Sequence, residues 1–211
     1  DPKGRHIPAF LEQLAQDWTE QQQSVTQELE SLRANIDHIK EIVAVQQDHA
    51  KAASAWETVD VTGLVEDSLR MNESSLIRRQ IRIVRDLEPT PPVLVEKHKA
   101  LQILVNLVRN ARTACEDRED TSGEITVRTR TEGGAVRISV SDNGSGIAPE
   151  NLTRIFAHGF TTRKNGHGFG LHSGALAATE LGGSLSVTSD GPGKGATFVL
   201  ELPAYVAETA A

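Results

Sequence analysis

The most informative segment of this sequence is Asp142-Asn143-Gly144-Ser145-Gly146-Ile147. Apolar residues alternate with polar ones just before it, from residue 135 to 142, which predicts a strand ending at the aspartate. A carboxylate in that place can accept a hydrogen bond from the exocyclic amine of a purine, and the glycines let backbone approach a flat ring closely. An ordinary Asx turn is the other interpretation of the same residues.

Upstream, Gln102-Ile-Leu-Val-Asn106-Leu-Val-Arg-Asn110-Ala lies within a predicted amphipathic helix over 97–115. Asn106 and Asn110 are four residues apart, so they share one face of the helix. Two amide oxygens on one face suit a hydrated Mg²⁺ ion, which takes its other ligands from water and phosphates. Taken alone, such a pair is more often a solvated polar face.

Downstream lie two more unusual segments, Ile155-Phe-Ala-His-Gly-Phe-Thr-Thr-Arg163 and Gly166-His-Gly168-Phe-Gly170-Leu-His172. The first has phenylalanines on both sides of a glycine and indicates a loop anchored by apolar side chains. The second opens a predicted helix over 170–181. Glycine-rich backbone that leads into a helix N-terminus favours an anion, because bare N–H groups and the helix dipole both point at it.

In this order and spacing, the four segments resemble the N, G1, F and G2 boxes of sensor histidine kinases. These kinases belong to the Bergerat-type ATPases, together with DNA gyrase, the large heat-shock chaperone ATPases and the MutL mismatch-repair proteins. The resemblance covers residues 59–203 and implies an α+β fold, a two-layer sandwich of a mixed sheet and three helices. The sequence has neither a Rossmann fingerprint nor a Walker A loop.

The resemblance also implies a role for each site residue, with ATP or ADP and Mg²⁺ as cofactors. Asn110 and Asn106 would hold Mg²⁺, Asp142 would bind adenine N6, and Thr197 would assist Asp142, often through water. Residues 148–167 would form a lid over the nucleotide. The remaining predicted contacts are Gly144, Gly146 and Ile147 around adenine, and Arg163, Lys164, His167, Gly168, Phe169, Gly170 and Leu171 around the phosphates.

The sequence departs from the family pattern after the second asparagine. The places that hold a lysine and an aromatic residue in many histidine kinases hold Thr113 and Ala114 here. Arg109 or Arg112 could replace the lysine, and the sequence leaves both open. Hydrolysing relatives carry a glutamate where Asn106 stands, and an amide is a poor general base, so phosphoryl transfer is favoured over hydrolysis.

The first 54 residues have a different pattern, because no glycine or proline interrupts residues 10–51. Apolar residues from Leu29 to Val43 follow a heptad, which predicts a long helix that forms a homodimer rather than folding back on its own domain. Ala52–Thr58 indicates a linker and residues 204–211 a frayed tail. His38 lies on this helix in a poor context for a phosphoacceptor, so we expect the acceptor on a helix further upstream.

Composition limits the alternatives. The formal net charge of −7 argues against binding to nucleic acid or to an anionic membrane. The single cysteine, Cys115, sits in an apolar helical run and indicates an inert core thiol in a reducing, cytoplasmic setting. The chain starts at Asp1 without methionine, so we expect it to be a piece of a longer protein. Attachment of that full-length protein to a membrane is compatible with a cytoplasmic fragment.

The sequence thus predicts the catalytic fragment of a sensor histidine kinase, with the receiver domain of a response regulator as partner. A non-catalytic ATP-sensing dimerisation module and a serine kinase of the anti-sigma-factor type are the alternatives. The long helix argues against the serine kinase.

Overall fold

The computed structural model describes residues 18, 21, 22, 25, 26 and 28 and the ranges 55–118, 122–162 and 168–205. One compact unit spans Ser54–Thr162 and Gly168–Ala211 and contains every named element. In chain order, these are β1 (Glu57–Val59), α2 (Val61–Arg78), β2 (Arg82–Leu87), β3 (Val93–Val95), α3 (Lys97–Glu116), β4 (Glu124–Glu132), β5 (Ala135–Asp142), α4 (Pro149–Leu152), α5 (Gly170–Glu180), β6 (Ser184–Thr188) and β7 (Ala196–Pro203).

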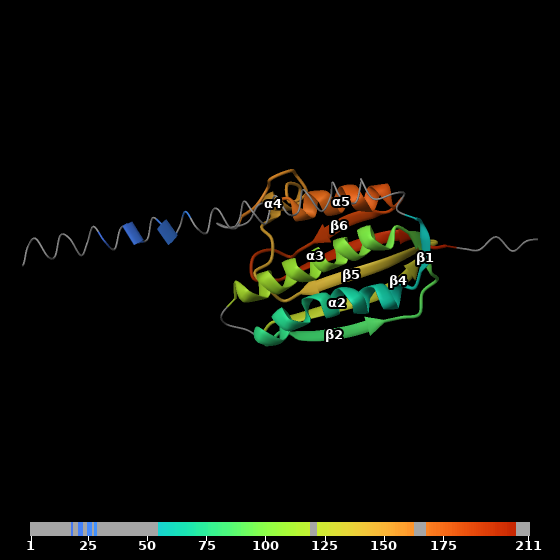
Figure 1. Ribbon diagram of the computed structural model, residues 1–211, viewed down its shortest axis with the longest axis horizontal. Coiled ribbons are helices and arrows are strands. Elements are labelled where there is room, and N and C mark those ends of the chain that lie inside the picture. The colour runs from blue at the N-terminus through green and yellow to red at the C-terminus, as the bar shows by residue number, and fades with distance from the viewer. Residues whose placement is uncertain are drawn as a thin grey trace, which may run out of the picture. The chain divides into compact units, whose positions relative to one another are not determined.

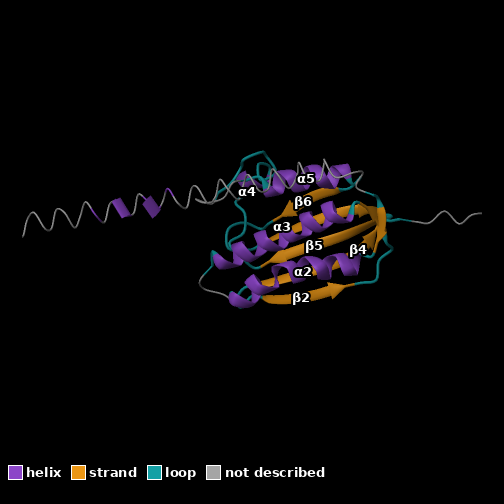
Figure 2. Cartoon of the chain, viewed as in Figure 1, coloured by secondary structure: helices purple, strands orange, loops and turns teal. Residues whose placement is uncertain are grey.

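The main sheet has the strand order β2-β4-β5-β7-β6. β2 runs parallel to β4, and the other neighbours are antiparallel. Helices α2, α3 and α5 lie side by side over one face of this sheet (Figures 1 and 2), with α3 packed between the other two. The predicted α+β sandwich of a mixed sheet and three helices is therefore confirmed.

Local sequence explains how α2 and α3 begin and pack. Asp60 has an extended backbone, and its carboxylate accepts a hydrogen bond of 2.7 Å from the Gly63 amide, so it caps α2. In α3, the apolar face enters the core against β4 and β5. Its buried residues are Ala100, Ile103, Leu104, Leu107, Val108, Ala111 and Cys115.

Side chains along β5 and β7 point alternately to the two faces of the sheet, and every second one packs against the helices. Val136, Ile138 and Val140 are buried beneath them, and Asp142 continues the same series at the end of β5. Because Asp142 pairs with Ala196 across the ladder, Ala196 shares its face while the next residue of β7 points to the opposite side.

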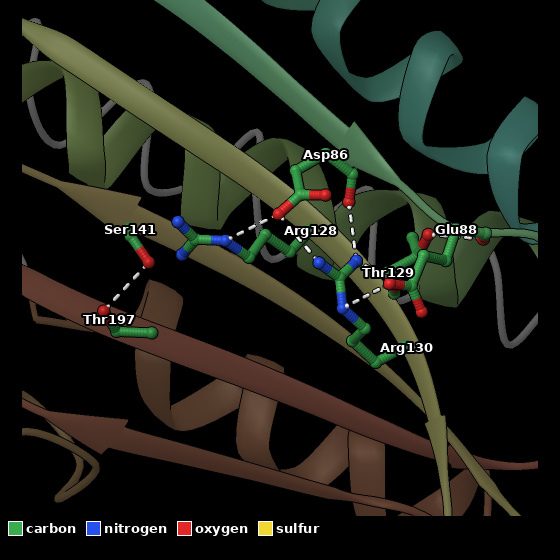
Figure 3. Close-up of polar contacts among 7 residues, drawn as sticks. All are labelled: Asp86, Glu88, Arg128, Thr129, Arg130, Ser141 and Thr197. Atoms are coloured by element: carbon green, nitrogen blue, oxygen red, sulfur yellow. Dashed lines mark hydrogen bonds and ion pairs between the residues drawn. The ribbon is translucent and has the colours of Figure 1, made fainter.

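The helix-free face of the sheet is polar. Asp86 of β2 binds Arg128 at 3.0 Å and Arg130 at 2.8 Å, both from β4 (Figure 3). The hydrogen bond from Arg130 holds the pKa of Asp86 below its ordinary value. The ion pair is therefore complete above the unfolded-state pKa and is lost as pH falls through the lower folded value. This solvated cluster stabilises little at neutral pH.

Two elements were not predicted. β1 falls in the predicted linker over Ala52–Thr58, and it exists because Glu57–Val59 pairs with Val93–Val95 of β3. Three residues are too few for a period to be recognised in the sequence. The single turn of α4 lies in the glycine-rich stretch and starts with Pro149 at its first positions.

The predicted heptad from Leu29 to Val43, with His38, lies outside the described residues. The six described residues upstream are all helical, and two of them, Trp18 and Val25, are 66% and 55% exposed. Within the part of the chain that the structure describes, no helix is long and apolar enough to cross a membrane.

One glycine in α5 is a place where a methyl group should stabilise the fold. A Cβ added at Gly174 would meet Leu185 Cδ2 at 3.5 Å, an ordinary contact. We expect Gly174→Ala to raise the free energy of unfolding by about 0.5–1 kcal/mol, because alanine loses less backbone entropy in a helix. Urea unfolding measures this, and a lowered midpoint would show that the site cannot accept the methyl group.

Candidate functional site

Asp142 stands at the end of β5, on the side of the sheet that α3 covers. Its Oδ1 accepts a hydrogen bond of 2.9 Å from the Gly144 amide. Burial raises the pKa of the Cys115 thiol, which lies near the end of α3, to about 11, and the negative charge of Asp142 adds to the rise. The thiol therefore stays protonated at neutral pH, which agrees with an inert core cysteine.

The loop after Asp142 packs directly on the backbone of α3. A Cβ added at Gly144 would overlap the carbonyl group of Ala114, and the Ser145 amide donates to that carbonyl at 2.9 Å. Gly146 has a φ of +69° and lies against the Gly191 carbonyl, where a side chain does not fit. Only glycines allow this loop to lie so close to the helix and to the β6–β7 turn.

The β6–β7 turn is hydrogen-bonded to the loop after Asp142, a contact that the sequence did not predict. The Gly193 amide donates to the Ser145 carbonyl at 2.6 Å, and the Gly195 amide donates to the Gly144 carbonyl at 3.2 Å. The Ser189 hydroxyl accepts from the Ile147 amide at 3.0 Å and donates to the Gly195 carbonyl at 2.6 Å. The sequence feature that could have predicted this contact is the series of glycines at alternate positions 191, 193 and 195.

Arg118, just beyond α3, was also missed. Its guanidinium donates to the Gly193 carbonyl at 2.6 Å and to the Asn143 carbonyl at 3.3 Å. It thereby ties the loop after Asp142 to the β6–β7 turn. A lone arginine after a helix gives no signal in the sequence.

The start of α5 lies against Asn106 of α3. A Cβ added at Gly170 would come within 2.5 Å of Asn106 Oδ1, so the first residue of α5 touches that side chain. Phe169, the N-cap residue of α5, makes no side-chain capping hydrogen bond, and the first turn of α5 has no acidic residue. Gly168, with a φ of +70°, packs on the backbone of Gly159 and Phe160. The N-terminus of α5 suits an anion.

Asn106 itself is 9% exposed, and the orientation of its amide is fixed by a donor. Arg109 Nη2 donates to Asn106 Oδ1 at 3.0 Å, so Nδ2 is the atom left for other partners. Among the described residues, Nδ2 has no hydrogen-bond partner. A guanidinium so close to Oδ1 opposes a metal ion on the same oxygen. Asn106 therefore fits a phosphate oxygen, and Asn110, one turn further along, remains the candidate for Mg²⁺.

The structure does not bring Thr197 to Asp142. Its hydroxyl donates to Ser141 Oγ at 2.9 Å on the helix-free face of the sheet (Figure 3). Ala196, the residue opposite Asp142, occupies the position predicted for the threonine. Adjacent residues of a strand point to opposite faces, so the hydroxyl cannot assist the carboxylate.

The remaining predicted contacts divide into two groups. Ile147 and Leu171 are half-buried against the core, and Phe169 is the residue before α5. Arg163, Lys164 and His167 lie outside the described residues. The base of the predicted lid is held to α5, because His172 Nδ1 is 2.9 Å from the Phe156 carbonyl oxygen.

Comparison with known proteins agrees with this geometry. Residues 96–206 match the family model described as histidine kinase-, DNA gyrase B-, and HSP90-like ATPase. The sensor histidine kinase ZraS of Escherichia coli (strain K12) is 34% identical over 153 residues, which cover 72% of this chain and 32% of ZraS. The C4-dicarboxylate transport sensor protein DctB of Rhizobium meliloti (strain 1021) is 34% identical over 140 residues, 66% of this chain and 22% of DctB.

Solved structures show the same fold. Full-length ShkA in complex with AMPPNP is 28% identical, with a TM-score of 0.64 over 72% of this chain and 32% of ShkA. The mycobacterial sensor histidine kinase MprB is 25% identical, with a TM-score of 0.61 over 71% of this chain and 97% of that chain. The chain spans about a third of the length of ZraS. The chain belongs to the histidine kinase-, DNA gyrase B- and HSP90-like ATPase family, and its relatives within that family are sensor histidine kinases.

Proposed function

We propose that this chain is the catalytic part of a sensor histidine protein kinase, which binds Mg-ATP and transfers the γ-phosphate to a histidine. One observation carries the proposal. Helix α3 joins two different ends of one site: Gly144, whose amide donates to the Asp142 carboxylate, packs on Ala114, and the start of α5 lies against Asn106. The first end suits a purine amine and the second suits phosphates.

Each end has a distinct task in this proposal. Asp142 accepts the N6 proton of adenine, while Gly144, Gly146 and Ile147 shape the pocket around the ring. Gly168, Gly170 and Asn106 Nδ2 donate to phosphate oxygens. Asn110 holds Mg²⁺, whose charge, when the ion is bound, offsets that of the phosphates. Arg163, Lys164 and His167 are expected to meet the triphosphate.

Transfer is favoured over hydrolysis by the chemistry of Asn106. Its Oδ1 already accepts from Arg109, and an amide cannot take a proton from water at neutral pH. An attacking imidazole needs no such base, because its neutral nitrogen is the nucleophile.

The partners follow from the same proposal. We expect a cytoplasmic homodimer formed by the N-terminal helix, in keeping with the exposure of Trp18 and Val25 on its described part. The expected recipient of the phosphoryl group after the histidine is the receiver domain of a response regulator.

Incubation with radiolabelled ATP tests the proposed function. We expect little label on this chain alone and transfer in trans to a longer form that includes the upstream helix, with the label lost in acid and kept in base. His38→Ala should leave that transfer within about twofold, because His38 has a poor acceptor context.

Other outcomes of the same assay would contradict the proposal. An acid-stable label would identify a serine kinase of the anti-sigma-factor type. Nucleotide binding without any transfer would identify an ATP-sensing module. An acid-labile label on this chain that disappears in His38→Ala would make His38 the acceptor.

A further inference from the structure

Two arginines of α3, Arg109 and Arg112, are candidates for the positive charge at the phosphate end of the site, and the structure separates them. Arg112 Nε pairs with Glu116 Oε1 at 3.6 Å. The same oxygen also pairs at 3.4 Å with Nε of Arg79, the C-cap residue that follows α2. Arg112 is thus held towards α2, away from Asn106 and α5.

Arg109 points the other way along the helix. Its guanidinium donates to Asn106 Oδ1 at 3.0 Å, and Asn106 in turn touches Gly170 at the start of α5. The charge of Arg109 therefore lies one side chain away from the N-terminus of that helix.

Three groups that meet here present N–H donors. Arg109 has only N–H groups to offer, the first amides of α5 have no intrahelical acceptor, and Asn106 Nδ2 is buried without a partner among the described residues. A buried amide without an acceptor costs free energy, so this arrangement is complete only when an anion is bound. The unpartnered Nδ2 is independent of the helix terminus and points to the same ligand.

The distance along α3 indicates which phosphate of a nucleotide would reach the donors at Asn106 and α5. Ala114, which packs on the loop after Asp142, and Asn106 are eight residues apart, which is about 12 Å along a helix. A nucleotide with its base at Asp142 must extend along α3 to reach Asn106. Its last phosphate then lies nearest to Arg109.

We propose that Arg109 binds the terminal phosphate of ATP and makes the site prefer ATP to ADP. This inference rests on the nucleotide site proposed above. It identifies Arg109, rather than Arg112, as the residue that supplies the cation missing at Thr113.

Calorimetric titration of the whole chain with AMPPNP and with ADP, both with Mg²⁺, tests this. In Arg109→Gln, we expect affinity for AMPPNP to fall roughly tenfold or more, since a charge-assisted hydrogen bond is lost. Affinity for ADP should change less than about twofold. Arg109→Lys should keep part of the preference. Arg112→Gln, the matched control, should leave the ratio of the two affinities unchanged.

ADP binding also serves as a folding control for each variant. An equal loss of AMPPNP and ADP affinity in Arg109→Gln, or no loss of either, would overturn the role of Arg109. A changed ratio in Arg112→Gln alone would assign the contact to that residue instead. If the parent chain binds ADP but shows no preference for AMPPNP, the inference fails and the nucleotide site stands. If it binds neither nucleotide, the proposed function fails with it.

Discussion

Asp142→Asn should weaken the binding of adenine nucleotides by roughly 10- to 100-fold, the expected effect of losing a hydrogen bond to a charged group. The asparagine oxygen can still accept from the Gly144 amide, the bond of 2.9 Å that Asp142 makes now. The other atom changes from an acceptor to an N–H donor. It then faces the N6 amine of adenine, which is also a donor, so the pair repels.

The same substitution should shift base preference. Guanine presents an oxygen where adenine has its amine, so the new donor suits guanine better. We expect the ratio of ADP to GDP affinity to fall in Asp142→Asn, measured by calorimetry in Mg²⁺.

Thr197→Val is the matched control for this variant. It removes the hydroxyl that binds Ser141 on the helix-free face and should leave both affinities unchanged. If Asp142→Asn bound ADP as tightly as the parent chain, Asp142 could not be the group that binds adenine. Weaker ADP binding in Thr197→Val would restore the role that the sequence suggested.

Gly144→Ala should reduce the affinity for every nucleotide, whatever its base. The added Cβ would lie 2.7 Å from the Cys115 nitrogen and would overlap the Ala114 carbonyl. Backbone atoms within α3 cannot rotate away, so the loop must move off the helix. Overpacking of this kind costs about 1–3 kcal/mol, and it opens the pocket at its adenine end.

Urea unfolding and calorimetry together check this prediction. Gly174→Ala is the control, because the same methyl group meets only an ordinary contact in α5 and should raise stability. Parent-like stability and parent-like ADP binding in Gly144→Ala would show that the loop does not depend on its close contact with α3.

Much of the fold could be predicted from local patterns. Strand Ala135–Asp142 has the predicted limits, and helices Lys97–Glu116 and Gly170–Glu180 each differ from their predictions by one residue. These elements show strong periodicity, and each begins or ends at a turn signal. The short strand Glu57–Val59 depends on a partner 36 residues away in β3, so no local pattern could reveal it.

The sequence predicted which segments form the site, but not where every side chain in them points. The motifs indicated which loops meet, yet Thr197 was assigned to the wrong face because a one-residue step along a strand reverses every side chain. Arg109 and Arg112 could not be separated either, because only the tertiary position of Glu116 and Arg79 shows where Arg112 is held. Arg118 donates to two backbone carbonyl groups. Every residue has such a group, so the sequence gives no sign of these contacts.

We infer that one site binds adenine at Asp142 and phosphates at Asn106 and α5. The most direct test is calorimetric titration of the 211-residue chain with AMPPNP, with Mg²⁺ and again with EDTA. We expect one nucleotide per chain, tighter binding with Mg²⁺, and weaker binding of the guanine analogue. Failure to bind AMPPNP in Mg²⁺, or equal binding of both bases, would contradict it.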